Sequence, residues 1–173
     1  MTVQAVTTEA LSDPSRAAIL RVCDAAYRTD TRPYFEALRS GTHLLGFVGG
    51  RLVSHLMWVT RWLEPEGREP LCTAYVEMVA TEPAWQRQGY ASELLREFPN
   101  HVGAYDVAAL CPATEGLYLR QGWRFWTGPL FARRDGGLEP TPGERVMLLA
   151  LPRTPALNRD SGLSVEWRPG EIW

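Results

Sequence analysis

The residues from 71 to 98 constrain the fold most, because they predict a strand, a loop and a helix in direct succession. A β-rich run covers 71–80, and Pro83 marks the turn that follows it. Apolar residues at helical spacing, Leu94, Leu95 and Phe98, then indicate a helix that stops near Pro99. A chain with this order places its loop where a strand ends and a helix begins.

The loop that opens this helix reads Gln86-Arg87-Gln88-Gly89-Tyr90-Ala91. The first N–H groups of a helix lack intrahelical partners and lie at the positive end of its dipole, so they form a ready anion site. Small residues at Gly89 and Ala91 allow the main chain to approach a pyrophosphate closely. The side chains of residues 86–88 can add donors or charge. The loop therefore predicts phosphate binding.

The remaining chain predicts further strands around a small number of helices. The Gly49-Gly50 pair accepts the positive φ angles of a tight hairpin between two β-rich runs. We expect a helix that starts with Asp13 as its N-cap and Pro14 in its first turn. The expected strands are 3–7, 43–48, 51–63, 71–80, 104–111, 123–127 and 145–151, and the other expected helices are 34–39 and 114–121. Residues 135–143 are expected to be loop, and 152–173 a tail without a long helix.

Composition excludes several classes of partner. The 173 residues carry a net charge of −2, so no broad basic surface for nucleic acid or an anionic membrane is expected. No run approaches the ~20 apolar residues of a membrane span, which predicts a cytoplasmic protein. The size and the 45% hydrophobic content predict a single domain over residues 1–173. The three cysteines, Cys23, Cys72 and Cys111, have no metal-binding spacing, so we expect buried thiols and no metal.

The strand, the loop and the helix together resemble the hallmark of the GNAT superfamily of acetyl-CoA-dependent N-acyltransferases. This resemblance implies an α/β (α+β) GNAT fold with a mixed, mostly antiparallel central sheet of about six or seven strands flanked by about four helices. The chain is also similar to the aminoglycoside 2′-N-acetyltransferases over nearly its whole length, in segments 75–80, Trp85, 117–123, Gly128-Pro129 and 167–173. Acetyl-CoA as co-substrate, an aminoglycoside as small-molecule partner and a homodimer are the expectations that this likeness carries.

Acetyl transfer from a thioester to an amine assigns roles to three positions. The family resemblance points to Glu77 as the general base that takes a proton from the substrate ammonium. It points to the main chain at Val79 as a donor to the developing oxyanion, and to Tyr118 as the general acid for the leaving thiolate. Two plainer interpretations stay open: Glu77 as a solvent-facing strand carboxylate, and Tyr118 as a core side chain.

The same resemblance divides the remaining site residues between cofactor and substrate. Acetyl-CoA is expected to contact Val79 and the loop residues Gln86, Arg87, Gln88, Gly89, Tyr90 and Ala91. Because an aminoglycoside carries several ammonium groups, its site is expected to be rich in carboxylates. The expected substrate residues are Asp30, Glu77, Met78, Cys111, Glu144, Glu171 and Trp173 with its carboxylate. Segments 34–36 and 143–145 carry fewer acids than relatives do, which favours a less cationic substrate such as kasugamycin.

Other interpretations differ in mechanism or in class. Cys111 with His101 could act as a covalent acyl carrier, and His43 and His55 are expected to be structural or surface residues. The chain could acetylate a polyamine, an amino acid or a peptide. It could instead be a non-catalytic protein that sequesters an antibiotic or senses acetyl-CoA. Release of free CoA in the presence of different amines separates these possibilities.

Overall fold

The computed structural model describes all residues from 1 to 173, and they divide into two structural units. Unit 1 comprises Met1–Val59 and Val76–His101, and unit 2 comprises Thr60–Tyr75 and Val102–Trp173. The long strands β3 (Arg51–Pro65) and β4 (Leu71–Thr81) each contribute to both units.

Unit 1 is built on antiparallel strands. Strand β1 (Thr2–Thr7) pairs with β2 (Thr42–Val48), which pairs with the first half of β3. Between β2 and β3, Gly49 and Gly50 adopt φ angles of +55° and +79°, which confirms the predicted hairpin. Because glycine has no Cβ, it adopts both angles without strain.

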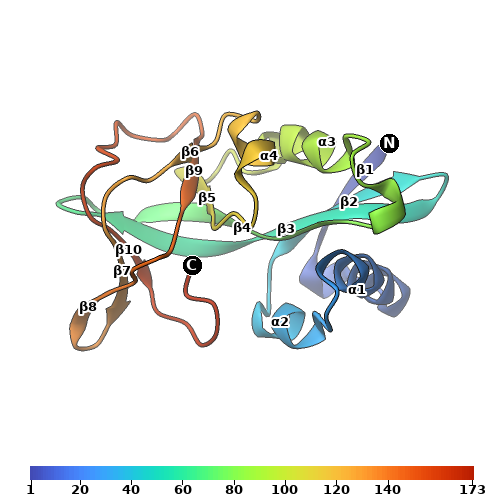
Figure 1. Cartoon of the computed structure of the whole chain (residues 1–173), viewed down its shortest axis with the longest axis horizontal. Helices are drawn as coiled ribbons and strands as arrows, with labels where there is room; N and C mark the ends of the chain where they lie inside the picture. The colour runs from blue at the N-terminus through green and yellow to red at the C-terminus, as the bar shows by residue number, and fades with distance from the viewer. The chain divides into compact units, whose positions relative to one another are not determined.

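Three helices cover the strands of unit 1. Figure 1 shows α1 (Asp13–Tyr27) and α2 (Arg32–Ala37) on one face and α3 (Tyr90–Glu97) on the other. Helix α1 buries one apolar stripe that includes Ile19, Val22 and Cys23. Its N-cap is Ser12 rather than the predicted Asp13, because the Ser12 hydroxyl accepts the Ser15 N–H at 3.3 Å.

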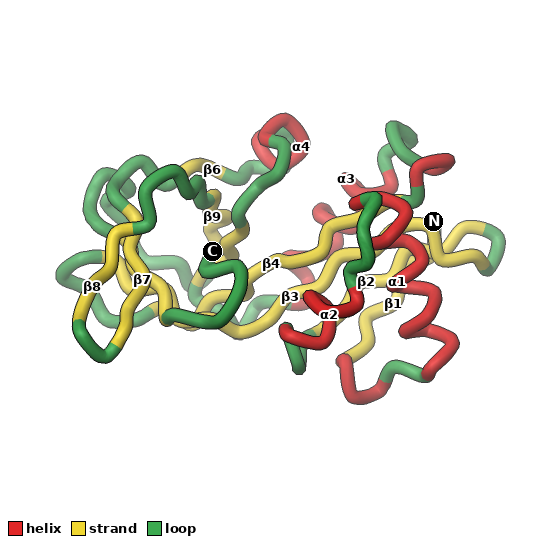
Figure 2. Tube along the Cα trace, turned by 60° about the horizontal axis from the view of Figure 1, so that its bottom comes forward, coloured by secondary structure: helices red, strands yellow, loops and turns green.

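Unit 2 consists mainly of short strands and loops, with a single short helix (Figure 2). Its strands follow the order β6-β9-β5-β4-β3-β10-β7-β8, in which the β4–β5 and β7–β10 pairs are parallel. Together with unit 1 this gives ten strands and four α-helices, and it confirms the predicted α/β fold with a mixed, mostly antiparallel sheet. The elements are β5 (Val107–Leu110), α4 (Glu115–Leu119), β6 (Arg124–Phe125), β7 (Leu130–Arg134), β8 (Gly137–Pro140), β9 (Met147–Ala150) and β10 (Leu163–Glu166).

Two strands of unit 2 lie where the sequence predicted loop or tail. Strand β8 occupies the predicted loop 135–143 and pairs with β7, which the sequence analysis also missed. All four β8 residues are exposed, so the strand carries no apolar alternation that could reveal it. Strand β10 lies in the predicted tail, and its partners are β3 and β7. Strand β10 forms by pairing with strands that are distant in the sequence, and no local pattern predicts it.

Other predicted elements are present with shifted ends. The strand predicted at 104–111 begins only at Val107, because the Tyr105 N–H bonds Val102 O in a turn. The strand predicted at 123–127 is reduced to β6. None of the helices combines the length and the apolar character that crossing a membrane requires.

Candidate active site

The functional strand of unit 1 is irregular at Met78, which adopts a φ of +51° inside β4. This left-handed conformation is costly for a residue with a side chain, so it persists only where neighbouring groups enforce it. Glu77 and Val79, the predicted base and oxyanion donor, flank this residue. We call residues 77–79 the β4 distortion.

Glu77 is buried, with 8% of its surface exposed, so the interpretation as a solvent-facing strand residue is wrong. The Tyr34 hydroxyl donates to Glu77 Oε2 at 2.8 Å. Tyr34 lies on α2 and is half-buried. This hydrogen bond from a phenol orients the carboxylate. Sequence reasoning missed this residue, because nothing in a single sequence links positions 34 and 77.

Two more side chains bind the carbonyls of the β4 distortion. The Tyr27 hydroxyl donates to Val79 O at 3.0 Å, and His55 Nδ1 lies 2.9 Å from Met78 O. Tyr27 comes from the end of α1, and His55 from β3. The carbonyls of residues 78 and 79 are therefore fixed by side chains from two different elements.

His55 belongs to a fully buried chain of hydrogen bonds, which we call the histidine relay. His55 Nε2 lies 2.9 Å from His43 Nδ1, and His43 Nε2 lies 2.9 Å from Thr8 Oγ1. Both rings are 0% exposed, and Cys23 Sγ lies 3.6 Å from His55 Nδ1. Burial lowers the pKa of His43 to about 4 and that of His55 to about 3, so both rings are neutral at pH 7. Of the two roles expected for these histidines, the structural one is confirmed.

The loop before α3 places backbone donors at the start of that helix. Gly89 is the N-cap with a φ of +91°, and no side chain caps the helix. The Gln86 amide donates to Thr81 O at 3.0 Å and the Gln88 amide to Ala84 O at 3.2 Å. Both glutamines thus hold the loop in shape through main-chain contacts.

The surroundings of the loop fit a phosphate-bearing ligand. A Cβ added at Gly89 would meet no atom within 4 Å, so the space beside the N-cap is open. Arg87 and Gly89 are exposed, and Tyr90 and Ala91 are half-buried. Since the N–H groups of the first helical turn have no partner within the helix, they are available to an anion.

Asp30, predicted to contact substrate, lies exposed at the start of α2. Its Oδ1 accepts the Arg32 N–H at 3.0 Å. The observed contact is therefore a local one that supports the beginning of the helix.

In unit 2, Tyr118 lies on α4 with 8% of its surface exposed. Its ring packs edge-on against Trp123, with the ring centroids 6.1 Å apart. Burial raises the pKa of Tyr118 to about 12, so the phenol keeps its proton throughout the neutral range. The observed role of the residue is packing in the core, and its part as general acid stays a prediction.

Three predicted substrate residues of unit 2 lie together. Cys111 Sγ contacts Glu144 Oε2 at 3.7 Å. Desolvation of the sulfur by nearby atoms raises the pKa of the Cys111 thiol, and the charges of Glu144 and Glu171 raise it further. Both glutamates are exposed. Cys111 and Glu144 are thus in contact, and the charge of Glu171 is near enough to act on the same thiol.

The cysteines do not share the predicted burial. Only Cys23 is buried, whereas Cys72 is half-buried and Cys111 exposed. The prediction of three buried thiols is wrong for the last two, because Cys111 follows the end of β5 instead of lying inside it. No group of three or more His, Cys, Asp or Glu side chains is arranged to hold a metal ion.

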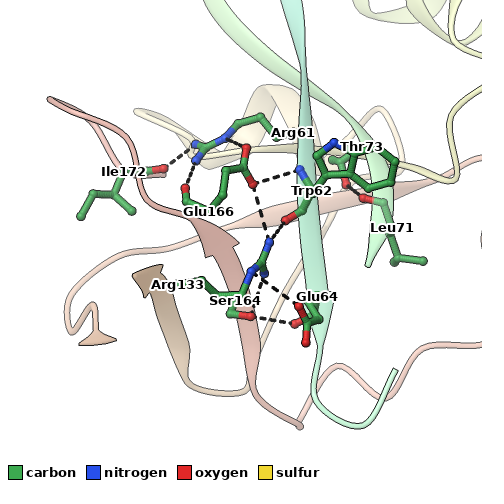
Figure 3. A network of polar contacts seen from close by, with 9 residues as sticks. All are labelled: Arg61, Trp62, Glu64, Leu71, Thr73, Arg133, Ser164, Glu166 and Ile172. Carbon is green, nitrogen blue, oxygen red and sulfur yellow. Dashed lines mark hydrogen bonds and ion pairs between the residues drawn. The ribbon is translucent and has the colours of Figure 1, made fainter. Parts of the chain in front are cut away.

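Trp173 is buried, with 3% of its surface exposed, and its indole N–H donates to Thr141 Oγ1 at 2.8 Å. The segment that leads to it is anchored by Arg61, a residue of β3 (Figure 3). Arg61 donates to Glu166 Oε1 at 3.0 Å, to Glu166 O at 2.6 Å and to Ile172 O. The predicted substrate residues Glu171 and Trp173 therefore lie on a segment that one buried guanidinium holds.

Arg61 is 2% exposed, and burial lowers its pKa. Arg133 extends the network, with Nε 3.5 Å from Glu64 and Nη2 3.8 Å from Glu166 (Figure 3). Sequence reasoning missed Arg61. The only signal was a cation inside an apolar strand pattern, where a buried charge needs partners.

Two sequence comparisons identify proteins that are similar to this chain. An Acetyltransferase (GNAT) domain model matches residues 9–126. An Aminoglycoside 2'-N-acetyltransferase of Mycolicibacterium fortuitum is 29% identical over 180 aligned positions, which cover 99% of this chain and 92% of that protein.

Solved structures share the fold. A GNAT family acetyltransferase from Brucella melitensis, in complex with acetyl-CoA, has a TM-score of 0.61 at 18% identity, covering 97% of each chain. Eis1 from Mycobacterium abscessus has a TM-score of 0.60 at 21% identity over 71% of this chain. The match spans about a third of the Eis1 chain, 31% of its length. The domain match, which takes in β4, the Gly89 loop and α3, shows that the chain belongs to the GNAT acetyltransferases.

Proposed function

We propose that this protein transfers an acetyl group from acetyl-CoA to the 2′-amino group of an aminoglycoside antibiotic, with residues 1–173 working as one catalytic domain. The observation that carries the proposal is a buried Glu77 on a distorted β4, held by the Tyr34 hydroxyl, in the same unit as the open helix start at Gly89. The named relative from M. fortuitum supports the substrate class.

Glu77 acts as the general base. A substrate amine is mostly an ammonium at neutral pH and must lose a proton before it can attack. The Tyr34 bond orients the carboxylate, which accepts the proton directly or through water. The N–H of Val79, next to the left-handed Met78, is proposed as the donor to the oxyanion.

Residues of the α3 loop hold the pyrophosphate of acetyl-CoA. Main-chain N–H groups from Gly89 to Ala91 supply the donors, and Arg87 supplies a positive charge. When bound, acetyl-CoA supplies the activated thioester whose acetyl group is transferred. Tyr118, whose phenol is protonated at neutral pH, is proposed to provide the proton for the departing thiolate.

The group of Cys111, Glu144 and Glu171 attracts the cationic substrate. Two carboxylates suit a ligand with few ammonium groups better than one with many. A small atypical aminoglycoside such as kasugamycin is therefore the proposed substrate, and kanamycin-like compounds are expected to be acetylated more slowly.

The test is release of free CoA from acetyl-CoA with kasugamycin, kanamycin, a polyamine and a peptide amine. Turnover that is highest with kasugamycin supports the proposal. Turnover only with the polyamine or the peptide contradicts the substrate class. Absence of turnover with every amine contradicts the catalytic role and favours a binding protein.

Glu77→Gln tests the base. We expect turnover at pH 7 to fall by about 10²- to 10⁴-fold, the range for a positioned acid–base group. Glu36→Gln is the matched control, because Glu36 is an exposed carboxylate on α2 near Tyr34. A turnover of Glu77→Gln similar to that of Glu36→Gln would remove Glu77 from the mechanism.

A further inference from the structure

The histidine relay is fully buried, contacts the β4 distortion directly and has no role in the chemistry described above. We propose that His55 is a positioning residue that holds the Met78 carbonyl and thereby sets the main chain from which Glu77 and Val79 act. The inference rests on the proposed acetyl transfer for its kinetic consequence and on the structure for the contact itself.

The hydrogen bonds of the histidine relay all run in one direction. Met78 O can only accept, so His55 Nδ1, 2.9 Å away, must carry its ring hydrogen. Because a neutral imidazole has one N–H, His55 Nε2 is then the acceptor for His43 Nδ1–H. The same rule leaves His43 Nε2 to accept the Thr8 hydroxyl hydrogen at 2.9 Å, although Thr8 Oγ1 also lies 3.2 Å from Gly41 O. The Met78 carbonyl thus sets the direction of each hydrogen bond in the relay.

Both histidine rings of the relay are neutral because they are buried. Burial keeps the pKa of both rings well below 7, so each ring has one donor and one acceptor under assay conditions. Cys23 is also a thiol there, since burial raises its pKa to about 12. No member of the relay carries a charge that could disturb its direction.

The relay contacts the main chain between the proposed reacting groups, Glu77 and Val79. A φ of +51° at Met78 is unfavourable and needs support from outside the strand. His55 supplies that support at the carbonyl of Met78 itself, whereas Tyr34 and Tyr27 hold its two neighbours. Loss of the His55 donor would let the Met78–Val79 peptide rotate. Displacement of reacting groups by about 1 Å costs on the order of 10²-fold in rate.

The experiment compares two substitutions at His55 that preserve different ring nitrogens. In His55→Asn, the side-chain amide lies near the former Nδ1 and can still donate to Met78 O. In His55→Gln, the amide lies near the former Nε2, so it keeps the contact with His43 and loses the one with Met78. We expect kcat to fall about 10- to 100-fold in His55→Gln and less than about threefold in His55→Asn, with the KM for acetyl-CoA unchanged in both.

A purely structural role predicts a different pattern. Both variants remove a buried ring, so their urea midpoints should drop alike, and kcat would drop alike too. Equal kcat values, or a larger loss in His55→Asn, would overturn the proposal. If His55→Gln does not fold, His43→Gln and His43→Asn replace the pair. Asparagine then keeps the donor toward His55, and a kcat in His43→Gln no lower than in His43→Asn would overturn it.

A second readout does not depend on activity. The backbone amide resonances of Met78 and Val79 in the ¹⁵N-labelled full chain should shift in His55→Gln and stay near the wild-type positions in His55→Asn. Unshifted resonances in His55→Gln would refute the positioning role even if the wild type releases CoA. A wild type that releases no CoA would instead refute the proposed function, and the resonances would still decide the positioning.

Discussion

The two units fix their proposed functional segments by opposite electrostatic means. In unit 1, neutral donors hold the β4 distortion: His55 at Met78 O, Tyr27 at Val79 O and Tyr34 at the Glu77 carboxylate. In unit 2, a buried cation, Arg61, holds the segment from Glu166 to Trp173 through a carboxylate and two carbonyls.

The two units therefore respond to different conditions. A histidine of the relay can accept a hydrogen bond on its second ring nitrogen only while the pH stays above its pKa, so unit 1 depends on protonation equilibria. A guanidinium keeps its charge at every pH at which proteins fold, so unit 2 depends on whether its partners remain present. Acid should therefore weaken unit 1, and removal of one side chain should weaken unit 2.

Acidification is expected to have the largest effect. The folded pKa values of about 4 for His43 and about 3 for His55 lie below the ordinary value of 6.5, so the unfolded chain binds protons more readily. Stability from the relay is complete above pH 6.5 and is lost as the pH falls toward 4. Between pH 7 and pH 5 the loss is about 2 kcal/mol for each histidine.

Urea unfolding at pH 7 and pH 5 measures this loss, and hydrogen exchange assigns it to unit 1. His55→Asn should remove about half of the pH-dependent difference. His101→Gln, which removes an exposed histidine outside the relay, should retain all of it. A wild type whose unfolding free energy is the same at both pH values would contradict the comparison.

Removal of the Arg61 guanidinium is expected to have the next largest effect. In Arg61→Met the free energy of unfolding at pH 7 should fall by about 3 kcal/mol, because two carbonyls and a carboxylate lose a charged donor. The measurement is the urea midpoint, and hydrogen exchange should show the loss around residues 166–173.

Arg134→Met is the control for this variant. Arg134 pairs with Glu139 at 2.9 Å, but both side chains are about half exposed, at 47% and 57%. Exposed pairs contribute less than about 1 kcal/mol. Equal losses of unfolding free energy in Arg61→Met and Arg134→Met would contradict this prediction. They would mean that the buried Arg61 contacts stabilise the fold no more than an exposed ion pair.

The smallest effect concerns single contacts at the reacting groups. Tyr34→Phe removes the 2.8 Å bond to Glu77, and a bond worth about 1 kcal/mol should lower kcat about fivefold. Cys111→Ala removes the longer 3.7 Å sulfur contact in unit 2 and should change kcat less than about twofold. CoA release under saturating substrate measures both. A larger fall in kcat in Cys111→Ala than in Tyr34→Phe would contradict this prediction. It would favour a direct chemical role for the Cys111 thiol.

Local sequence signals predicted much of unit 1. The Gly49-Gly50 hairpin and the strand, loop and helix around Gly89 depend on backbone preferences of a few adjacent residues, and all are present. Unit 2 was predicted less well. Strand β8 is exposed on every residue, and β10 consists of four residues whose partners come from other parts of the chain.

The candidate site shows the same division. Glu77 and the Gly89 loop were identified from a family motif, and the structure shows a buried carboxylate and an uncapped helix start at these positions. The sequence did not connect Tyr34 with Glu77, His55 with Met78 or Arg61 with Glu166. Each acts across a separation of at least 23 positions: 43 from Tyr34 to Glu77, 23 from His55 to Met78 and 105 from Arg61 to Glu166.

Local sequence features predicted the family, the order of the main strands and the residues to which the proposed chemistry is assigned. Those features depend on backbone propensities and motifs formed by residues that are adjacent in the sequence. Only the tertiary structure decided which side chains hold the reacting segments in place. A buried donor or cation is stable only where distant backbone groups accept its hydrogens, and that pairing exists only once the chain has folded.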